Sequence, residues 1–166
     1  MLSRENDFSD PSADDFEALS RDRIPVRTMA ETDLAAIIAI DRKITGRDRR
    51  AYYQGKLTEV LDDTGVRVSL VAEVDGVFAG FIMARVDYGD YGRAASTAVI
   101  DTVGVHPAFI RRQVGSALLS QLLRNLASLR VERVHTQVPW TSFDLLTFFH
   151  RSGFQQAQRL SFTKRL

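Results

Sequence analysis

The sequence predicts an α/β domain with a mixed, mostly antiparallel sheet and helices on both faces. Three observations predict it. The chain has 166 residues, the length of one domain rather than two. Two β-rich runs meet at Asp75-Gly76, a dipeptide that favours a tight antiparallel hairpin. Further along, a strand, a helix and a strand follow one another, and this order indicates a parallel crossover.

The N-terminal segment, residues 1–22, is polar and acidic. It holds few apolar residues to bury, so we expect a flexible tail in front of a domain at 23–166. A short helix around Phe16 to Leu19, docked on the domain, is the alternative. The segment has no apolar stretch of the kind found in a secretory signal.

The domain should begin with a short strand, two helices and the hairpin. Residues 24–27 read as the strand, and residues 30–44 and 48–63 have the apolar spacing of helices. The hairpin covers residues 66–86, and both of its arms are rich in β-branched and aromatic residues.

The second half should alternate strands and helices after a glycine-rich loop at 87–93. The expected elements, in order, are a strand at 96–105, a helix at 114–129, a strand at 131–140, a helix at 142–153 and a final strand or two within 154–166. Gly153 is placed to end the last helix in a left-handed conformation.

Three of the four predicted helices start with a hydroxyl and an acid that can cap them. The pairs are Thr28 with Glu31, Thr45 with Asp48, and Thr141 with Asp144. The helix that follows His106 is different, because its start carries no capping oxygen and no acid. It carries Arg111 and Arg112 instead, two cations at the positive end of the helix dipole. Lacking a cap costs about 1 kcal/mol.

A bound anion would make this bare helix start favourable. The free N–H groups would point at phosphate oxygens, with Arg111 and Arg112 beside them. Gly115 would let a phosphate come close to the backbone of the first turn. The alternative is a frayed helix end with solvated arginines.

The stretch V-x-P-x-x-x-R-R-x-x-G-x-A resembles the central motif of the GNAT superfamily of acetyl-coenzyme A-dependent N-acetyltransferases. That motif, Q/R-x-x-G-x-G/A, falls here on Arg112, Gly115 and Ala117. A second signature of the family, an aromatic pair followed by Gly-Phe, is similar to Phe148 through Phe154. The resemblance covers about residues 24–160, and the order of elements is also that family's order.

The resemblance implies a single-domain fold in which the fourth and fifth strands are parallel and splay apart to admit acetyl-coenzyme A. It implies that backbone amides at the helix start hold the coenzyme's pyrophosphate, and that the fourth strand pairs with the pantetheine amides. Gly104 would allow a bulge or a close approach of the ligand there. The residues implied in binding the coenzyme are Val103, Gly104, Val105, Arg111, Arg112, Gln113, Val114, Gly115, Ser116, Ala117 and Phe149.

Transfer of an acetyl group to an amine requires a neutral amine, a donor for the thioester oxygen and a way for the thiolate to leave. A lysine-like amine has a pKa of about 10.4, so freeing it at pH 7 costs about 4.6 kcal/mol. Asp101 lies in an otherwise apolar strand, and alternation predicts that it shares a face with Val103 and Val105. We expect Asp101 to act as base or to orient the amine; an ordinary ion pair with an arginine is the alternative. The resemblance implies an N–H near Val105 as the oxyanion donor.

The family usually has tyrosine, the proton donor to the coenzyme sulfur, at the position of Phe149. Phenylalanine has no proton to give, so the acid is either dispensable or another hydroxyl, or the protein binds the coenzyme without turnover. The hydroxyls considered are Ser142, which stands where the family usually has asparagine, and Tyr88, with Tyr91, Thr141, Tyr52 and Tyr53 as further candidates.

Composition and charge limit the classes of partner and cofactor that we expect for this protein. The net charge is +1, which gives no broad basic field for a nucleic acid, and no apolar run has the length of a membrane span. There are no cysteines, and the three histidines have no metal-ligand spacing, so we expect no metal and a cytoplasmic location. The predicted function is transfer of acetyl from acetyl-coenzyme A to a primary amine, and a homodimer is expected from the resemblance. A non-catalytic acyl-coenzyme A binding or sensor domain is the alternative.

Overall fold

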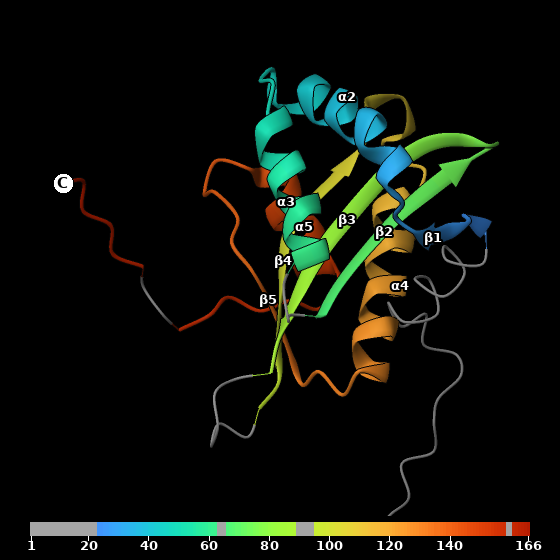
Figure 1. The fold of residues 1–166 in the computed structure, drawn as a ribbon. Helices are drawn as coiled ribbons and strands as arrows, with labels where there is room; N and C mark the ends of the chain where they lie inside the picture. The colour runs from blue at the N-terminus through green and yellow to red at the C-terminus, as the bar shows by residue number, and fades with distance from the viewer. Residues whose placement is uncertain (1–22, 63–65, 89–94, 159–160) are drawn as a thin grey trace, which may run out of the picture.

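The computed structural model describes residues 23–62, 66–88, 95–158 and 161–166. They form a five-stranded sheet in the order β1-β2-β3-β4-β5 (Figure 1). The strands are β1 (Val26–Thr28), β2 (Val66–Val74), β3 (Val77–Asp87), β4 (Thr97–Val105) and β5 (Arg133–Thr136). All neighbours pair antiparallel except β4 and β5, which are parallel. This confirms the predicted mixed, mostly antiparallel sheet.

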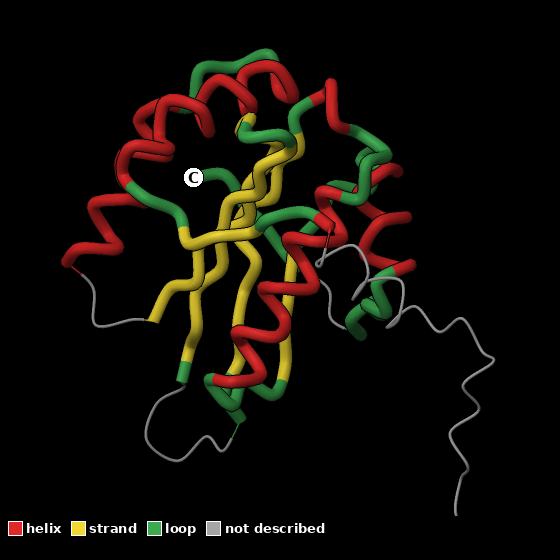
Figure 2. The backbone as a smooth tube through the Cα atoms, turned by 90° about the vertical axis from the view of Figure 1, so that its right-hand side faces the viewer, coloured by secondary structure: helices red, strands yellow, loops and turns green. Residues whose placement is uncertain are grey.

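Helices cover both faces of this sheet, as predicted (Figure 2). They are α2 (Leu34–Thr45), α3 (Arg50–Asp62), α4 (Val114–Ser128) and α5 (Phe143–Arg151), with short 3-10 turns at Glu31–Asp33 and Pro107–Phe109. The expected tail at 1–22 lies outside the described residues. None of the helices in the described part of the chain is long and apolar enough to cross a membrane.

Two separate apolar cores hold the layers together. The larger one joins α4 and Phe149 of α5 to the face of the sheet that carries Ile82, Ala98 and Ile100. The smaller one joins α2 and Tyr53 of α3 to the opposite face, through Val71, Phe81 and Met83. Each side chain on a strand therefore points either to the α4 and α5 face of the sheet or to the α2 and α3 face. The face to which a side chain points decides which groups it can contact at the site.

The predicted hairpin is confirmed. Asp75 and Gly76 have φ values of 52° and 74°, as a type I′ turn requires, and Val74 pairs with Val77 across it. The predicted end of the last helix is also confirmed, because Gly153 has φ 81° and donates its N–H to His150. Phe154 N–H reaches the carbonyl of Phe149, and their rings lie 5.1 Å apart, which completes a Schellman motif.

The expected capping pairs and the expected final strand were wrong. Thr141 does not cap α5, whose N-cap is Ser142 with no side-chain capping bond, and Thr45 is the last residue of α2 rather than the cap of α3. The pair Thr28 and Glu31 does not cap a helix, because Thr28 lies in β1; instead the Asp33 carboxylate accepts the N–H of Ala30 at 2.8 Å. The expected final strand is absent from the described residues after Gly153, which are loop at 154–158 and 161–166. Residues 161–166 lie away from the sheet in Figure 1, and Phe162 is 90% exposed.

Candidate active site

The open edge of β4 is the first feature of the site. β5 pairs with β4 only from Thr97 to Ile100, and beyond that point no described residue of β5 continues the ladder, although β4 runs on to Val105. The hydroxyl of Thr136, the last residue of β5, donates to the Ile100 carbonyl at 3.3 Å, where the two strands part. The strands therefore splay as the family resemblance implied.

Backbone direction shows which groups face this opening. His106 donates its N–H to Ala79 on β3 at 2.8 Å, and the direction of backbone groups alternates along a strand. Gly104 therefore also faces β3, while the N–H and C=O groups of Val103 and Val105 face away from it. These groups can pair with a ligand that has amides of its own, such as pantetheine.

A β-bulge re-aims Asp101. Met83 pairs with Thr102 but Ala84 pairs with Ile100, so Asp101 is the extra residue in β4. The expectation that Asp101 shares a face with Val103 and Val105 is wrong for this reason. The two valines pack against the core below α4, whereas Asp101 faces the side of α3.

Three cations surround the Asp101 carboxylate, whose side chain is 10% exposed. Arg85 of β3 binds it most closely, Lys56 Nζ of α3 lies 3.5 Å away and Arg67 Nη1 of β2 lies 4.0 Å away. This is the ion pair with an arginine that the sequence left open as the alternative. The three cations hold the Asp101 carboxylate beside the bulge, and Thr102 is the next residue of β4.

Gly104 is explained by packing. A Cβ at this position would lie 2.7 Å from a ring atom of Phe81 and 3.4 Å from the Ile44 side chain. The bulge lies at Asp101 rather than at Gly104. A side chain at Gly104 would push β4 away from α2, so this glycine sets the position of the open edge.

The start of α4 is the second feature. The helix begins at Val114, its N-cap is Gln113, no side chain caps it and no acid lies in its first turn. The bare start is therefore confirmed, and the helix begins two residues after Arg112. Gly115, Ser116 and Ala117 follow within the first turn, and Ala117 N–H makes an intrahelical bond to the Gln113 carbonyl at 2.9 Å.

The backbone in front of α4 contains two left-handed residues. Arg111 and Gln113 have φ values of 66° and 64°, and Arg112 between them does not have a positive φ. Left-handed non-glycine residues cost on the order of 1 kcal/mol each and are common at ligand sites. Alternation of left- and right-handed residues can turn successive N–H groups to one side as an anion-binding nest, but here the Arg112 N–H already donates to the Phe109 carbonyl at 3.2 Å. The bare helix end is therefore the feature that fits a diphosphate.

The ring of Phe148 lies against this loop. A Cβ on Gly115 would lie 3.3 Å from Phe148 and 3.8 Å from Val105, so Gly115 allows α5, the end of β4 and the start of α4 to meet. Phe149, the next residue, is 5% exposed and packs into the core beside Phe154. Phe149 therefore packs as an apolar core residue, and its side chain offers no hydroxyl to the site.

The two hydroxyls that the sequence favours, those of Ser142 and Tyr88, lie in different places. Ser142 precedes α5 and follows β5, so the parallel strands place it at the end of the sheet where β4 is open, and its hydroxyl makes no capping bond to α5. Tyr88 follows Asp87, which pairs with Thr97 at the opposite end of β4. From Gly80, the partner of Val105, to Asp87 is roughly 23 Å at ~3.3 Å per residue. The structure therefore does not bring Tyr88 to the open edge. Tyr91 lies outside the described residues.

A buried ionic network fastens α3 to the site, and the sequence analysis did not predict it. Asp41 of α2 is 4% exposed and accepts hydrogen bonds from Arg49 Nε at 2.9 Å and Tyr53 Oη at 3.0 Å. Tyr53 Oη also lies 3.5 Å from the hydroxyl of Thr102, beside the bulge. The available signal was an acid within the apolar stripe of a helix.

The charges in this network respond to burial and to hydrogen bonding. Burial opposes ionisation of Asp41, but hydrogen bonds from Arg49 and Tyr53 outweigh it and lower the pKa of the carboxyl below its usual value. Burial raises the pKa of Tyr53 to about 12, so this phenol keeps its proton at neutral pH. The network is therefore an ionised carboxylate held by two donors.

His106 connects β4 to α2. Its Nδ1 accepts the N–H of Ala108 at 3.0 Å, and its Nε2 lies 2.7 Å from Nζ of Lys43. Trp140, between β5 and α5, is 75% exposed and therefore is not part of the core.

Comparisons with known proteins agree with this geometry. The model of the acetyltransferase (GNAT) family matches residues 27–154. Among similar solved structures is AAC(6')-Iy in complex with the bisubstrate analogue CoA-S-monomethyl-acetylneamine, at 19% identity and a TM-score of 0.71, covering 86% of this chain and 98% of that one.

Two further structures show the same fold. Aminoglycoside 6'-N-acetyltransferase AAC(6')-IG from Acinetobacter haemolyticus has 14% identity and a TM-score of 0.71, covering 86% of this chain and 98% of its own. Glucosamine-6-phosphate N-acetyltransferase from Arabidopsis thaliana has 16% identity and a TM-score of 0.67, covering 86% and 97%. With the family match over most of the sequence, the chain belongs to the acetyltransferase (GNAT) family and is an N-acetyltransferase that uses acetyl-coenzyme A as co-substrate.

Proposed function

We propose that this protein transfers the acetyl group of acetyl-coenzyme A directly to a primary amine while both substrates are bound. The observation that carries the proposal is the continuity of two features: the open β4 edge ends at Val105, and the bare helix start follows within ten residues. Together they offer pairing partners for pantetheine and then donors for a diphosphate.

The reaction has simple requirements at this site. The amine nitrogen attacks the thioester carbon, the carbon–sulfur bond breaks, and the amine loses a proton as the thiol forms. The backbone N–H of Val105 faces the opening, and we assign it to the developing oxyanion. Ser142 has a hydroxyl without a capping bond at the same end of the sheet, and we assign it to the leaving sulfur. A thiol with a pKa near 8.5 leaves with little help, so this assistance is modest.

We assign Asp101 to the incoming amine. The bulge aims the carboxylate at the α3 side of β4, and Arg85 and Lys56 fix its position. From there it acts as base through water or holds the ammonium until it loses its proton. The acceptor is a small molecule, a protein N-terminus or a lysine.

Ser116→Glu tests coenzyme binding. Ser116 is the third residue of α4, where an acid favours the helix dipole, so the variant should unfold at the same or a higher temperature than the parent protein. The same charge repels a diphosphate, and calorimetry should find coenzyme A binding at least tenfold weaker. Ala127→Glu, exposed near the far end of α4, is the control. Equal affinity in Ser116→Glu and the parent protein would contradict the proposed site.

Catalysis itself is tested by thiol release with a panel of primary amines. Turnover above the rate of acetyl-coenzyme A hydrolysis is the expected result. The second candidate, a non-catalytic acyl-coenzyme A binding domain, is favoured by one observation, the buried Phe149 where the family has a tyrosine. Tight coenzyme binding without turnover for any amine would support that candidate instead. A cytoplasmic location and a homodimer stay predictions, for cell fractionation and gel filtration.

A further inference from the structure

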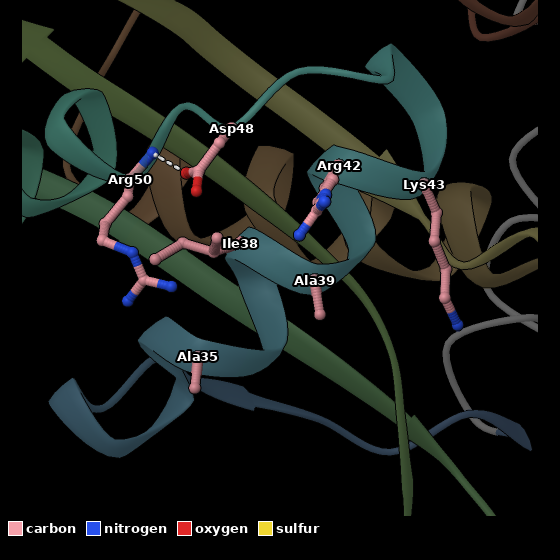
Figure 3. Close-up of a pocket in the computed structure, with 7 residues that line it drawn as sticks. All are labelled: Ala35, Ile38, Ala39, Arg42, Lys43, Asp48 and Arg50. Carbon is pink, nitrogen blue, oxygen red and sulfur yellow. Dashed lines mark hydrogen bonds between the residues drawn. The ribbon is translucent and has the colours of Figure 1, made fainter.

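A hollow lies between α2 and the segment that leads into α3, with a volume of about 490 Å³ (Figure 3). Ala35 and Ala39, one turn apart on α2, leave room in its floor, and Ile38 lies beside them. Its remaining lining residues are charged: Arg42, Lys43, Asp48 and Arg50. It is therefore a small apolar floor with a charged rim, which suits a small polar molecule.

The charge of the rim is positive. Three cations and one carboxylate line the hollow, so the formal sum is three minus one, or +2. The Lys43 ammonium points away from the two arginines in Figure 3 and lies 2.7 Å from His106 Nε2. The Arg42 and Arg50 guanidinium groups make no ion pair within the part of the chain that the structure describes, and Figure 3 shows Arg50 beside Ile38 and Arg42 near Ala39. Asp48 is already used, because its Oδ1 accepts the N–H of Arg50 at 2.9 Å.

One residue of the rim, Lys43, connects the hollow to the end of β4. Lys43 on its rim reaches His106, the residue after Val105, and the Ile44 side chain lies over Gly104. α2 covers the face of the sheet opposite α4. A coenzyme held at the start of α4 lies toward the other face, so an amine that attacks its thioester has the α2 and α3 side left for its approach.

We propose that this hollow binds an acidic group of the acceptor, and therefore that the substrate is an amine that also carries a phosphate or a carboxylate. The inference rests on the proposed function and deepens it. Arginine pairs bind both groups through paired hydrogen bonds. A phosphate monoester carries about −1.5 to −2 charges at pH 7 and matches the rim more closely than a carboxylate. A polycationic amine would meet like charge here.

Matched pairs of amines test the preference. O-phosphoethanolamine with ethanolamine gives the phosphate arm, and 4-aminobutyrate with butylamine gives the carboxylate arm. We expect kcat/KM for the acidic member to exceed that of its partner at least tenfold in one arm, and the arm shows which acidic group is recognised. Equal rates within both pairs, or a preference for a polycation such as spermidine, overturn the inference.

Variants connect the preference to the hollow. The double variant Arg42→Gln/Arg50→Gln should lose most of the preference for the acidic amine. Asp48→Asn should increase the preference, because it removes the opposing charge while an amide oxygen still caps Arg50. The control Arg124→Gln/Arg133→Gln, at two exposed arginines on α4 and β5, removes the same two charges and should keep the preference.

A binding measurement separates this inference from the proposed function. O-phosphoethanolamine and 4-aminobutyrate are titrated calorimetrically into protein saturated with coenzyme A, so that the diphosphate site is filled. Binding of one of them that the double variant weakens at least tenfold supports the hollow even without turnover. Turnover of neutral amines with no binding of either acidic amine keeps the proposed function and overturns the inference.

Discussion

Asp101 shows how one extra residue changes the role expected of a side chain. Strict alternation places it on the α4 side of the sheet, where the coenzyme is expected, but the bulge turns it to the α3 side among Arg85, Lys56 and Arg67. An extra residue of this kind depends on pairing with β3, which no local pattern in β4 reveals. The presence of an acid in an apolar strand was visible in the sequence; its direction was not.

We expect Asp101→Asn to lower kcat/KM about 100-fold at pH 7, the lower end of the effect of a general base. If the residue helps the amine to lose its proton, the deficit should shrink as the pH rises toward the amine pKa of about 10.4, because the amine then deprotonates unaided. A pH profile of kcat/KM from pH 6.5 to 9.5 measures this. Glu132→Gln, an exposed acid before β5, is the control. A deficit that stays constant with pH would mean that Asp101 only holds its arginine and lysine partners.

At the scale of elements, the pattern of capping residues predicted the uncapped start of α4. It did not predict the backbone conformation in front of that helix or the strand at Thr28. The bare start of α4 was visible because residues 108–112 hold no capping side chain, and the structure confirms it. The left-handed residues Arg111 and Gln113 were not visible, because neither is a glycine or asparagine. Thr28 fits a capping box, yet pairing of β1 with β2 holds it in a strand, so sheet hydrogen bonding outweighed the local signal.

The network of Asp41, Arg49 and Tyr53 determines how α2, α3 and β4 sit relative to one another. Asp41→Asn should cost about 3 kcal/mol of unfolding free energy at pH 7, at the low end for breaking a buried ion pair, because Arg49 is 38% exposed. The folded pKa of Asp41 lies below its unfolded value of about 3.9. Its contribution is therefore present above that value and is lost as the pH falls through the folded pKa.

Urea unfolding of both proteins between pH 7 and pH 2 measures this effect. The difference between the parent protein and Asp41→Asn should be constant down to about pH 5 and then shrink. Glu132→Gln is the control, since Glu132 is an exposed acid away from this network. A difference that does not change with pH would show that the carboxylate's charge contributes nothing to the fastening of α3.

At the scale of the whole molecule, the prediction of architecture was accurate where consecutive strands of the sequence pair with one another. The hairpin pairs β2 with β3, and the parallel crossover pairs β4 with β5, the next strand along the chain. The expected final strand was wrong, because β-propensity within 154–166 does not by itself bring these residues to the free edge of β5. The hollow beside α2 is lined by residues of α2, of α3 and of the segment between them. The sequence alone therefore did not show that these charged side chains lie around one hollow.

Coenzyme binding should stabilise the whole domain, because the start of α4, β4 and the Phe148 ring meet at one place between the layers. At a coenzyme A concentration 100 times the Kd, binding contributes about 2.7 kcal/mol. For a domain of this size each kcal/mol raises Tm by roughly 2–4 °C, so Tm should rise by about 5–11 °C. Thermal unfolding followed by circular dichroism measures the shift.

Pantetheine at the same concentration should raise Tm by much less than coenzyme A, because pantetheine lacks the diphosphate that the α4 start is arranged to bind. The Ser116→Glu variant should reduce the coenzyme A shift to about that of pantetheine, since its added carboxylate opposes the diphosphate and leaves the β4 edge unchanged. Equal shifts for the two ligands in the parent protein would place the binding free energy on the β4 edge alone. The bare helix start and the left-handed residues before it would then need a different explanation.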